Sequence, residues 1–182
     1  EVEQHTSHAT ADAIFRTLFS IPIENEIAAE MFREFHRYQR SQPLLNLTAV
    51  LPLPRWMPRF FRSATRRSAA KIRAAITQLT TDRHAQIEAG TAPDDLATKI
   101  MTTADPLSGE KFTAEEMVDQ VSIFFLAGHE TSASALAWAL YLMAMFPEWQ
   151  DKVAAEAKAG RVEEFSAISK LRISRDVFRE AL

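Results

Sequence analysis

The sequence predicts an all-α protein. Apolar residues return every three or four positions through nearly the whole chain, which is the periodicity of amphipathic helices. Only four glycines occur among the 182 residues, which argues against a turn-rich β fold. Residues 113–146 contain no proline and are mostly apolar, so we expect one helix of about 32 residues, roughly 48 Å long at 1.5 Å per residue.

Helix-breaking residues divide the first half of the chain. Pro22 ends the first helix, and four prolines within 41–58 predict an irregular connection. Gly90 is placed to close the long helix that follows that connection. Residues 105–109 read Asp-Pro-Leu-Ser-Gly, which predicts a turn. The helices expected between these breakers are 11–20, 24–40, 63–89 and 94–104.

The second half begins with a strong helix-start pattern. Thr113 and Glu116 have the spacing of a capping box, in which each side chain satisfies the backbone N–H of the other residue. This box opens the helix of 113–146, and Pro147 suits the first position of the next helix. The elements expected after it are a helix that ends at Gly160, a short turn or helix at 165–171, and a helix at 174–182.

Composition and charge limit the partners and the location that we expect for this protein. A net charge of −3 gives no overall reason to expect nucleic acid or an anionic membrane as a partner. The absence of cysteine fits a reducing compartment, and we expect a cytoplasmic protein. Residues 122–146 are numerous enough to cross a membrane. However, His129 and Glu130 lie near the centre of this run, which favours a buried core helix over a membrane span.

The segment 127–132, Ala-Gly-His-Glu-Thr-Ser, interrupts the apolar run. Gly128 weakens a helix by about 1 kcal/mol relative to alanine. Glu130 cannot be buried without a partner. The Thr131 hydroxyl can donate to the carbonyl of Ala127 and bend the helix. Three locally unfavourable residues in succession predict a functional groove in this helix.

Two segments resemble the cytochrome P450 monooxygenases. Residues 127–132 match every fixed position of that family's oxygen-binding helix motif, Ala/Gly-Gly-x-Asp/Glu-Thr-Thr/Ser. Residues 177–182 resemble the start of its Glu-x-x-Arg helix, with Glu180 as the glutamate. The resemblance implies that residues 1–182 are a single fragment of a P450 helical domain. Its expected parts are helices at 11–90 that include the two lid helices, a short helix at 94–104, the oxygen-binding helix at 113–146, and truncated following helices at 147–182.

The resemblance also implies an activity. Enzymes of this family use haem b, O2 and electrons from a redox partner to hydroxylate mostly apolar small molecules. Their haem iron is bound by a cysteine thiolate, and this chain contains no cysteine and so no such metal ligand. We therefore expect an oxidoreductase by family, whereas the isolated chain is expected to lack haem and to be inactive.

The resemblance assigns roles by position. Ala127 and Gly128 leave room for haem and dioxygen, Thr131 donates a hydrogen bond to the oxygen, and Glu130 relays protons. Ile123, Ala127 and Thr131 lie four residues apart and therefore share one helix face. The substrate pocket is assigned to Ile123, Leu126 and Ala127, cofactor contact to Ala127, Gly128 and Thr131, and a structural ion-pairing role to Glu180.

Simpler interpretations stand beside these roles. The alternative interpretation of Glu130 and Thr131 is a structural polar pair inside a helical bundle, either capped or bridged by water. A metal-binding role for His129 would need a second ligand three or four positions away, and none is there, so a structural role is favoured.

Residues 55–73 carry seven bases and no acid, interleaved with apolar residues within 54–61. This run is either a membrane-surface or acidic-substrate entrance or a solvated basic face, and the second is favoured.

A different class of function also stays open. The chain could be a non-catalytic helical bundle whose long apolar helix is buried by self-association, because a large exposed apolar surface is rarely tolerated in a monomer. We expect a homo-oligomer for any folded form of the isolated chain. A helical regulator unrelated to P450 explains neither of the two motifs.

Overall fold

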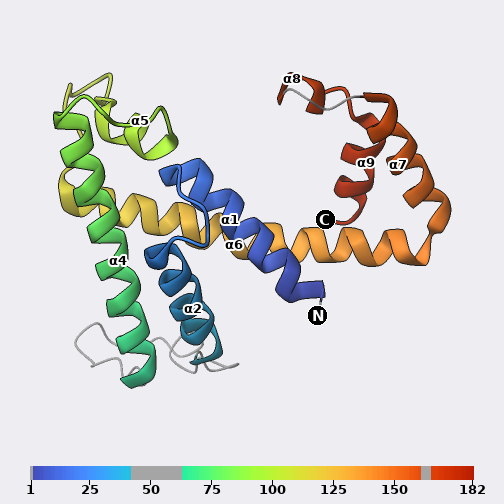
Figure 1. The fold of residues 1–182 in the computed structure, drawn as a ribbon, viewed down its shortest axis with the longest axis horizontal. Helices are drawn as coiled ribbons and strands as arrows, with labels where there is room; N and C mark the ends of the chain where they lie inside the picture. Colours follow the sequence, from blue (N-terminus) through green and yellow to red (C-terminus); the bar gives the residue numbers. More distant parts are fainter. Residues whose placement is uncertain (1, 42–62, 161–164) are drawn as a thin grey trace. The chain divides into compact units, whose positions relative to one another are not determined.

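The structure, a computed structural model, describes residues 2–41, 63–160 and 165–182. These residues form helices and no strand (Figure 1), which confirms the all-α prediction. The proline-rich connection predicted after Ser41 lies outside the described residues. The chain divides into two compact units, residues 11–125 and residues 1–10 together with 126–182. The assignment of residues 1–182 to a single domain stays a prediction.

The helix bounds follow the caps and breakers with one clear exception. The helices are α1 (Val2–Phe19), α2 (Glu26–Ser41), α4 (Ser63–Glu88), α5 (Leu96–Thr102), α6 (Ala114–Met145), α7 (Pro147–Gly160), α8 (Phe165–Ile168) and α9 (Arg172–Glu180). The prediction that the first helix starts at residue 11 was wrong, because α1 begins nine residues earlier. Its polar first turns carry no apolar stripe, and tertiary contacts stabilise them instead.

Local side-chain chemistry accounts for several helix ends. Gly90 adopts φ 69°, and the backbone N–H groups of Thr91 and Gly90 donate to the carbonyls of Gln86 at 2.9 Å and Ile87 at 3.1 Å. This pattern is a Schellman cap. Before α6, the Thr113 N–H donates to Glu116 Oε2 at 2.9 Å, and the Glu116 N–H donates to Thr113 Oγ1 at 3.3 Å. The predicted closing glycine and capping box are therefore confirmed.

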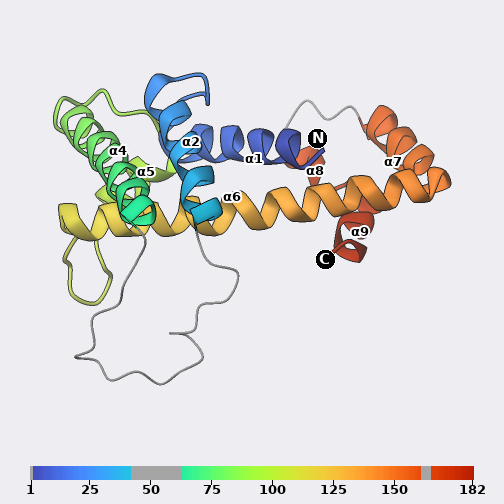
Figure 2. The ribbon, with the colours of Figure 1, turned by 90° about the horizontal axis from the view of Figure 1, so that it is seen from below.

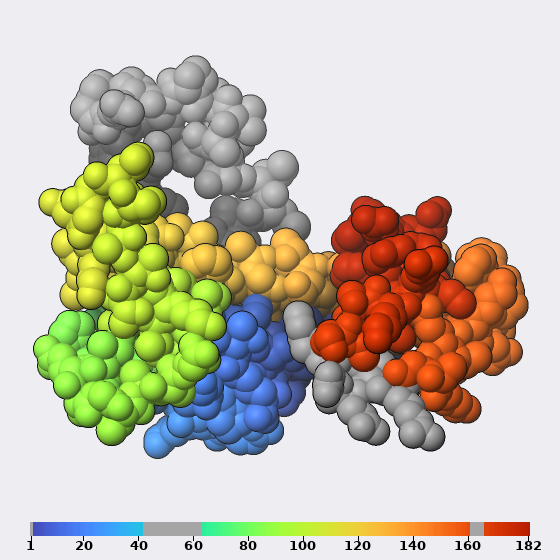
Figure 3. All heavy atoms as spheres, turned by 90° about the horizontal axis from the view of Figure 1, so that it is seen from above, coloured from blue at the N-terminus to red at the C-terminus, as the bar shows by residue number. Residues whose placement is uncertain are grey.

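The core of the 11–125 unit is built around aromatic rings. Phe125 on α6 contacts Phe15 and Phe35, with ring centroids 5.0 and 5.4 Å apart. The inward face of α2 includes Met31 and Phe35 together with buried Glu34. Figure 3 shows α5, in yellow-green, packed against the green surface of α4.

A buried ionic cluster joins three elements of this unit. Arg83 on α4 is 4% exposed, and its guanidinium pairs with Asp95 and donates to the carbonyl of Phe19 at 2.7 Å. Asp95 is also the N-cap of α5, since its side chain accepts from the Thr98 N–H at 3.0 Å. Ser20 donates to the second oxygen of Asp95 at 2.8 Å. The cluster therefore connects α4, the start of α5 and the end of α1.

In the other unit, α7 positions α9. The carboxylate of Glu156 on α7 accepts from the backbone N–H groups of Ile173 and Ser174, each at 2.8 Å. These N–H groups belong to the first turn of α9 and have no partner within the helix. Figure 3 shows the orange surface of α7 against the red C-terminal helices. No helix among the described ranges is long and apolar enough to cross a bilayer.

Candidate active site

The segment 127–132 forms part of an unbroken α-helix. All residues of α6 from Ala114 to Met145 are α-helical, so Gly128 does not interrupt the helix. The Thr131 hydroxyl donates to the carbonyl of Ala127 with an Oγ1–O distance of 2.6 Å. This is the hydrogen bond that the sequence predicted. The Ala127 carbonyl therefore accepts a hydrogen bond from the Thr131 side chain in addition to its backbone hydrogen bond within the helix.

The segment divides into an accessible side and a buried side. Ala127, Glu130 and Thr131 are exposed, and Gly128 is half-buried, whereas His129 is 1% exposed. Residues two apart on a helix point to nearly opposite sides, because successive residues turn by about 100°. The small residue and the alcohol therefore share the accessible side, and the Glu130 carboxylate is not buried, as its charge requires.

His129 is fixed by the first turns of α1, which lie beside α6 (Figure 2). Its Nε2 lies 2.9 Å from Ser7 Oγ, and both side chains are buried. The Thr10 hydroxyl donates to the His129 carbonyl at 3.2 Å. These contacts support a structural role for His129 and explain why α1 extends to Val2.

Two residues in these contacts were missed by the sequence argument. Ser7 and Thr10 lie 122 and 119 positions from His129 along the chain. They are small polar residues in a stretch without apolar periodicity, and nothing local distinguishes them from surface residues.

Two of the three residues assigned to the substrate pocket are large, apolar and exposed, and the third is the smaller Ala127. Ile123, which belongs to the 11–125 unit, is 57% exposed. Leu126, in the other unit, is 42% exposed. Side chains of this kind usually mark a binding surface when they gather in a patch. Their assignment to a substrate pocket stays a prediction, as does the self-association of the chain.

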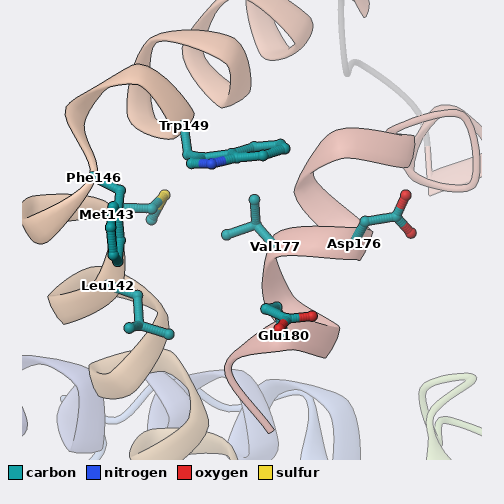
Figure 4. Close-up of a pocket in the computed structure, with 7 residues that line it drawn as sticks. All are labelled: Leu142, Met143, Phe146, Trp149, Asp176, Val177 and Glu180. Atoms are coloured by element: carbon teal, nitrogen blue, oxygen red, sulfur yellow. The ribbon is translucent and has the colours of Figure 1, made fainter.

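Glu180 lies at the edge of an apolar groove (Figure 4). The groove has a volume of about 550 Å³, and the Trp149 indole faces Val177 across it. Glu180 is exposed, and no ion pair joins it to another side chain of the described residues. The groove is lined by Leu142, Met143, Phe146, Trp149, Asp176, Val177 and Glu180.

The basic run of 55–73 is only partly described. Arg55, Arg59 and Arg62 lie outside the described residues, as do the apolar residues within 54–61. On α4, Arg73 pairs with Asp119 of α6 at 2.6 Å, and Lys71 pairs with Glu34 of α2 at 3.0 Å. Part of this run therefore joins helices within its unit. No three His, Asp or Glu side chains of residues 2–41, 63–160 and 165–182 gather to hold a metal ion.

Comparison with known proteins gives a consistent result. Residues 1–182 match the family model described as Cytochrome P450. Cytochrome P450 monooxygenase FUM15 of Gibberella moniliformis is 33% identical over 115 residues, which cover 63% of this chain and 19% of that protein. Cyclooctat-9-en-7-ol 5-monooxygenase of Streptomyces melanosporofaciens is 29% identical over 176 residues, which cover 92% of this chain and 36% of that protein.

A solved structure agrees with these sequence matches. The crystal structure of a cytochrome P450 (CYP102L1) superimposes with a TM-score of 0.71 at 29% identity. The match covers all of this chain and 42% of that structure. The chain thus spans between about a fifth and two fifths of the length of these three proteins.

Proposed function

The chain belongs to the cytochrome P450 family, and from that premise we propose that it is part of a haem-thiolate monooxygenase acting on an apolar small molecule. The observation that carries the proposal is the accessible side of α6 at Ala127 and Thr131. There a small residue and an alcohol lie one helical turn apart, with the hydroxyl bonded to the helix carbonyl at 2.6 Å.

The residues present fit the open face of a haem. Ala127 is exposed and Gly128 has no side chain, so a flat macrocycle can approach the helix backbone closely. Leu126 adds an exposed apolar side chain beside them, and Thr131 supplies a polar atom on the same helix face as Ala127. When bound, the haem supplies the activation of O2. The thiolate that holds its iron in this family does not come from these 182 residues, which contain no cysteine.

Thr131 holds a proton that can turn in two directions. A hydroxyl has one proton to donate and two lone pairs to accept with. While the proton points at the Ala127 carbonyl, Oγ1 can only accept from other groups. A rotation about the Cα–Cβ bond releases the proton toward the accessible side, and the Ala127 carbonyl keeps its place in the helix ladder. In this proposal Thr131 therefore donates a hydrogen bond to the oxygen only after this rotation.

Glu130 supplies protons from solvent in this proposal. Its side chain is exposed, and it points about 100° away from Thr131 because adjacent helical residues do not face each other. The Glu130 carboxylate therefore takes a proton from solvent and, as a carboxyl group, passes it through water to the Thr131 side.

The proposal is tested by the absorption spectrum of the reduced protein under carbon monoxide. We expect the red-shifted Soret band of thiolate-bound haem from a protein that joins this chain to the family's cysteine-bearing loop. The 182-residue chain alone, mixed with haem, should not give that band. A longer protein that binds haem without the thiolate band, or gives the band without O2-dependent product, would contradict the proposal.

A further inference from the structure

Positive charge is concentrated in one stretch of the sequence. Residues 35–81 contain nine Lys and Arg and no Asp or Glu, although the whole chain has 21 basic and 24 acidic residues. The stretch begins after Glu34 and ends before Asp82. It includes the second half of α2 and most of α4, two helices that pack against each other (Figure 1).

A pocket of about 540 Å³ lies where α2 ends and α4 begins. Four cations line it, two from each helix, and the hydroxyls of Ser41 and Ser68 lie among them. Ala64 in its lining belongs to the first turn of α4, which contains no acidic residue. The N-terminal dipole of this 26-residue helix adds partial positive charge there. The cations are Arg37, Arg40, Arg67 and Lys71.

One buried carboxylate holds two of these cations in place. Glu34 is 3% exposed and accepts from Arg37 Nη1 at 2.5 Å, Lys71 Nζ at 3.0 Å and Ser68 Oγ at 3.0 Å. The hydrogen bond from Lys71 and those from Ser68 and Arg37 keep the pKa of Glu34 below its usual value, although burial acts in the opposite direction. Glu34 therefore stays ionised and fixes both cations before any ligand arrives.

The charge of the pocket is not neutralised. Among the described residues, the acids near its cations are Glu34 and Glu30, the latter 3.8 Å from Lys71. Arg67 donates at 3.4 Å to the Ser63 carbonyl, and no acid of the described residues pairs with Arg67 or Arg40. Four cations and one carboxylate therefore line the pocket, which leaves it with net positive charge.

We propose that this pocket binds a phosphate group, carried either by a soluble phosphorylated molecule or by the headgroup of an anionic lipid. Arginine forks bind phosphate oxygens in pairs, and a lysine ammonium adds a point charge. A pocket of this volume admits one phosphate group with its substituent. The proposal is independent of the oxygenase function, because it rests on a different cluster of residues.

The test compares two matched variants of the 182-residue chain. Arg40→Gln/Arg67→Gln removes two pocket cations that hold no ion pair among the described residues, so the fold should survive, as circular dichroism would verify. Arg66→Gln/Lys99→Gln removes two exposed cations outside the pocket lining. Binding of inorganic phosphate is measured by calorimetry, and binding to vesicles of phosphatidylcholine with phosphatidic acid by sedimentation, with pure phosphatidylcholine vesicles as the blank.

Phosphate binding that weakens at least about tenfold in the pocket variant and not in the control variant supports a soluble ligand, since the variant loses two donors of charge-assisted hydrogen bonds. The same pattern with the acidic vesicles alone supports a lipid headgroup. Equal weakening in both variants would show only general attraction of anions and would overturn the proposal. Absence of binding to both probes would overturn it as well.

Discussion

Replacing Thr131 with alanine is expected to separate oxygen consumption from product formation in a holoprotein that contains this chain. The variant loses the hydroxyl that now donates to the Ala127 carbonyl and that can turn toward the oxygen. Product formed per electron pair should fall on the order of a hundredfold, the lower end of what a positioned proton donor contributes. Electrons should instead appear as hydrogen peroxide. The measurement is product and peroxide per electron pair consumed.

Two further variants separate proton delivery from helix stability. Thr131→Ser keeps the hydroxyl and should retain most of the product yield. Ser134→Ala removes an exposed hydroxyl from the next turn of α6 and should leave the yield unchanged. If Thr131→Ala forms product as efficiently as the parent, Thr131 is not the proton donor. The interpretation of Glu130 and Thr131 as a structural polar pair would then be correct.

Removing the charge of Asp95 is expected to destabilise the 11–125 unit strongly. Asp95→Asn keeps an N-cap acceptor for α5 but leaves Arg83, which is 4% exposed, without its counter-ion. Loss of one partner from a buried ion pair costs about 3–5 kcal/mol of unfolding free energy. The measurement is urea unfolding followed by circular dichroism. Asp94→Asn is the matched control, because Asp94 is exposed and pairs with exposed Lys99.

The pH dependence gives a second readout for Asp95. Burial would raise the pKa of Asp95, but the hydrogen bonds from Arg83, the Thr98 N–H and Ser20 outweigh burial and lower it. A lowered pKa in the folded state adds stability that is complete above the unfolded pKa of about 3.9 and is lost as pH falls through the folded pKa. The unfolding free energy of the parent should therefore decline below about pH 4. The Asp95→Asn variant should lose less unfolding free energy over the same pH range, because it has no Asp95 carboxylate to protonate. If Asp95→Asn lowers the unfolding free energy by less than about 1 kcal/mol at neutral pH, the buried ion pair is not a major source of stability.

Features that depend on a few neighbouring residues were predictable from the sequence. Gly90 and the pair Thr113 and Glu116 fix helix ends by contacts within one turn. The segment 127–132 is equally local, since the Thr131 hydroxyl reaches the Ala127 carbonyl within the same helix. For this reason the hydrogen bond could be expected before the fold was known.

Features that depend on distant residues could not be predicted. Asp95 could be recognised only as an acid that opens a short helix, because its partners Ser20 and Arg83 are separated from it by 75 and 12 positions. The contact of Ser7 with His129 crosses 122 positions. Such contacts follow from how helices pack, and a single sequence contains no periodic pattern that records them.

The most direct test of the central claim is the haem content of an Ala127→Phe holoprotein. If the accessible side of α6 at Ala127 lies against the haem, a phenyl ring there should lower bound haem per protein about tenfold or more, since overpacking costs about 1–3 kcal/mol. Ala144→Phe places the same ring at another exposed position of α6 and should leave haem content unchanged. Full haem content in Ala127→Phe, with an unaltered carbon monoxide spectrum, would show that this side of the helix does not face the haem.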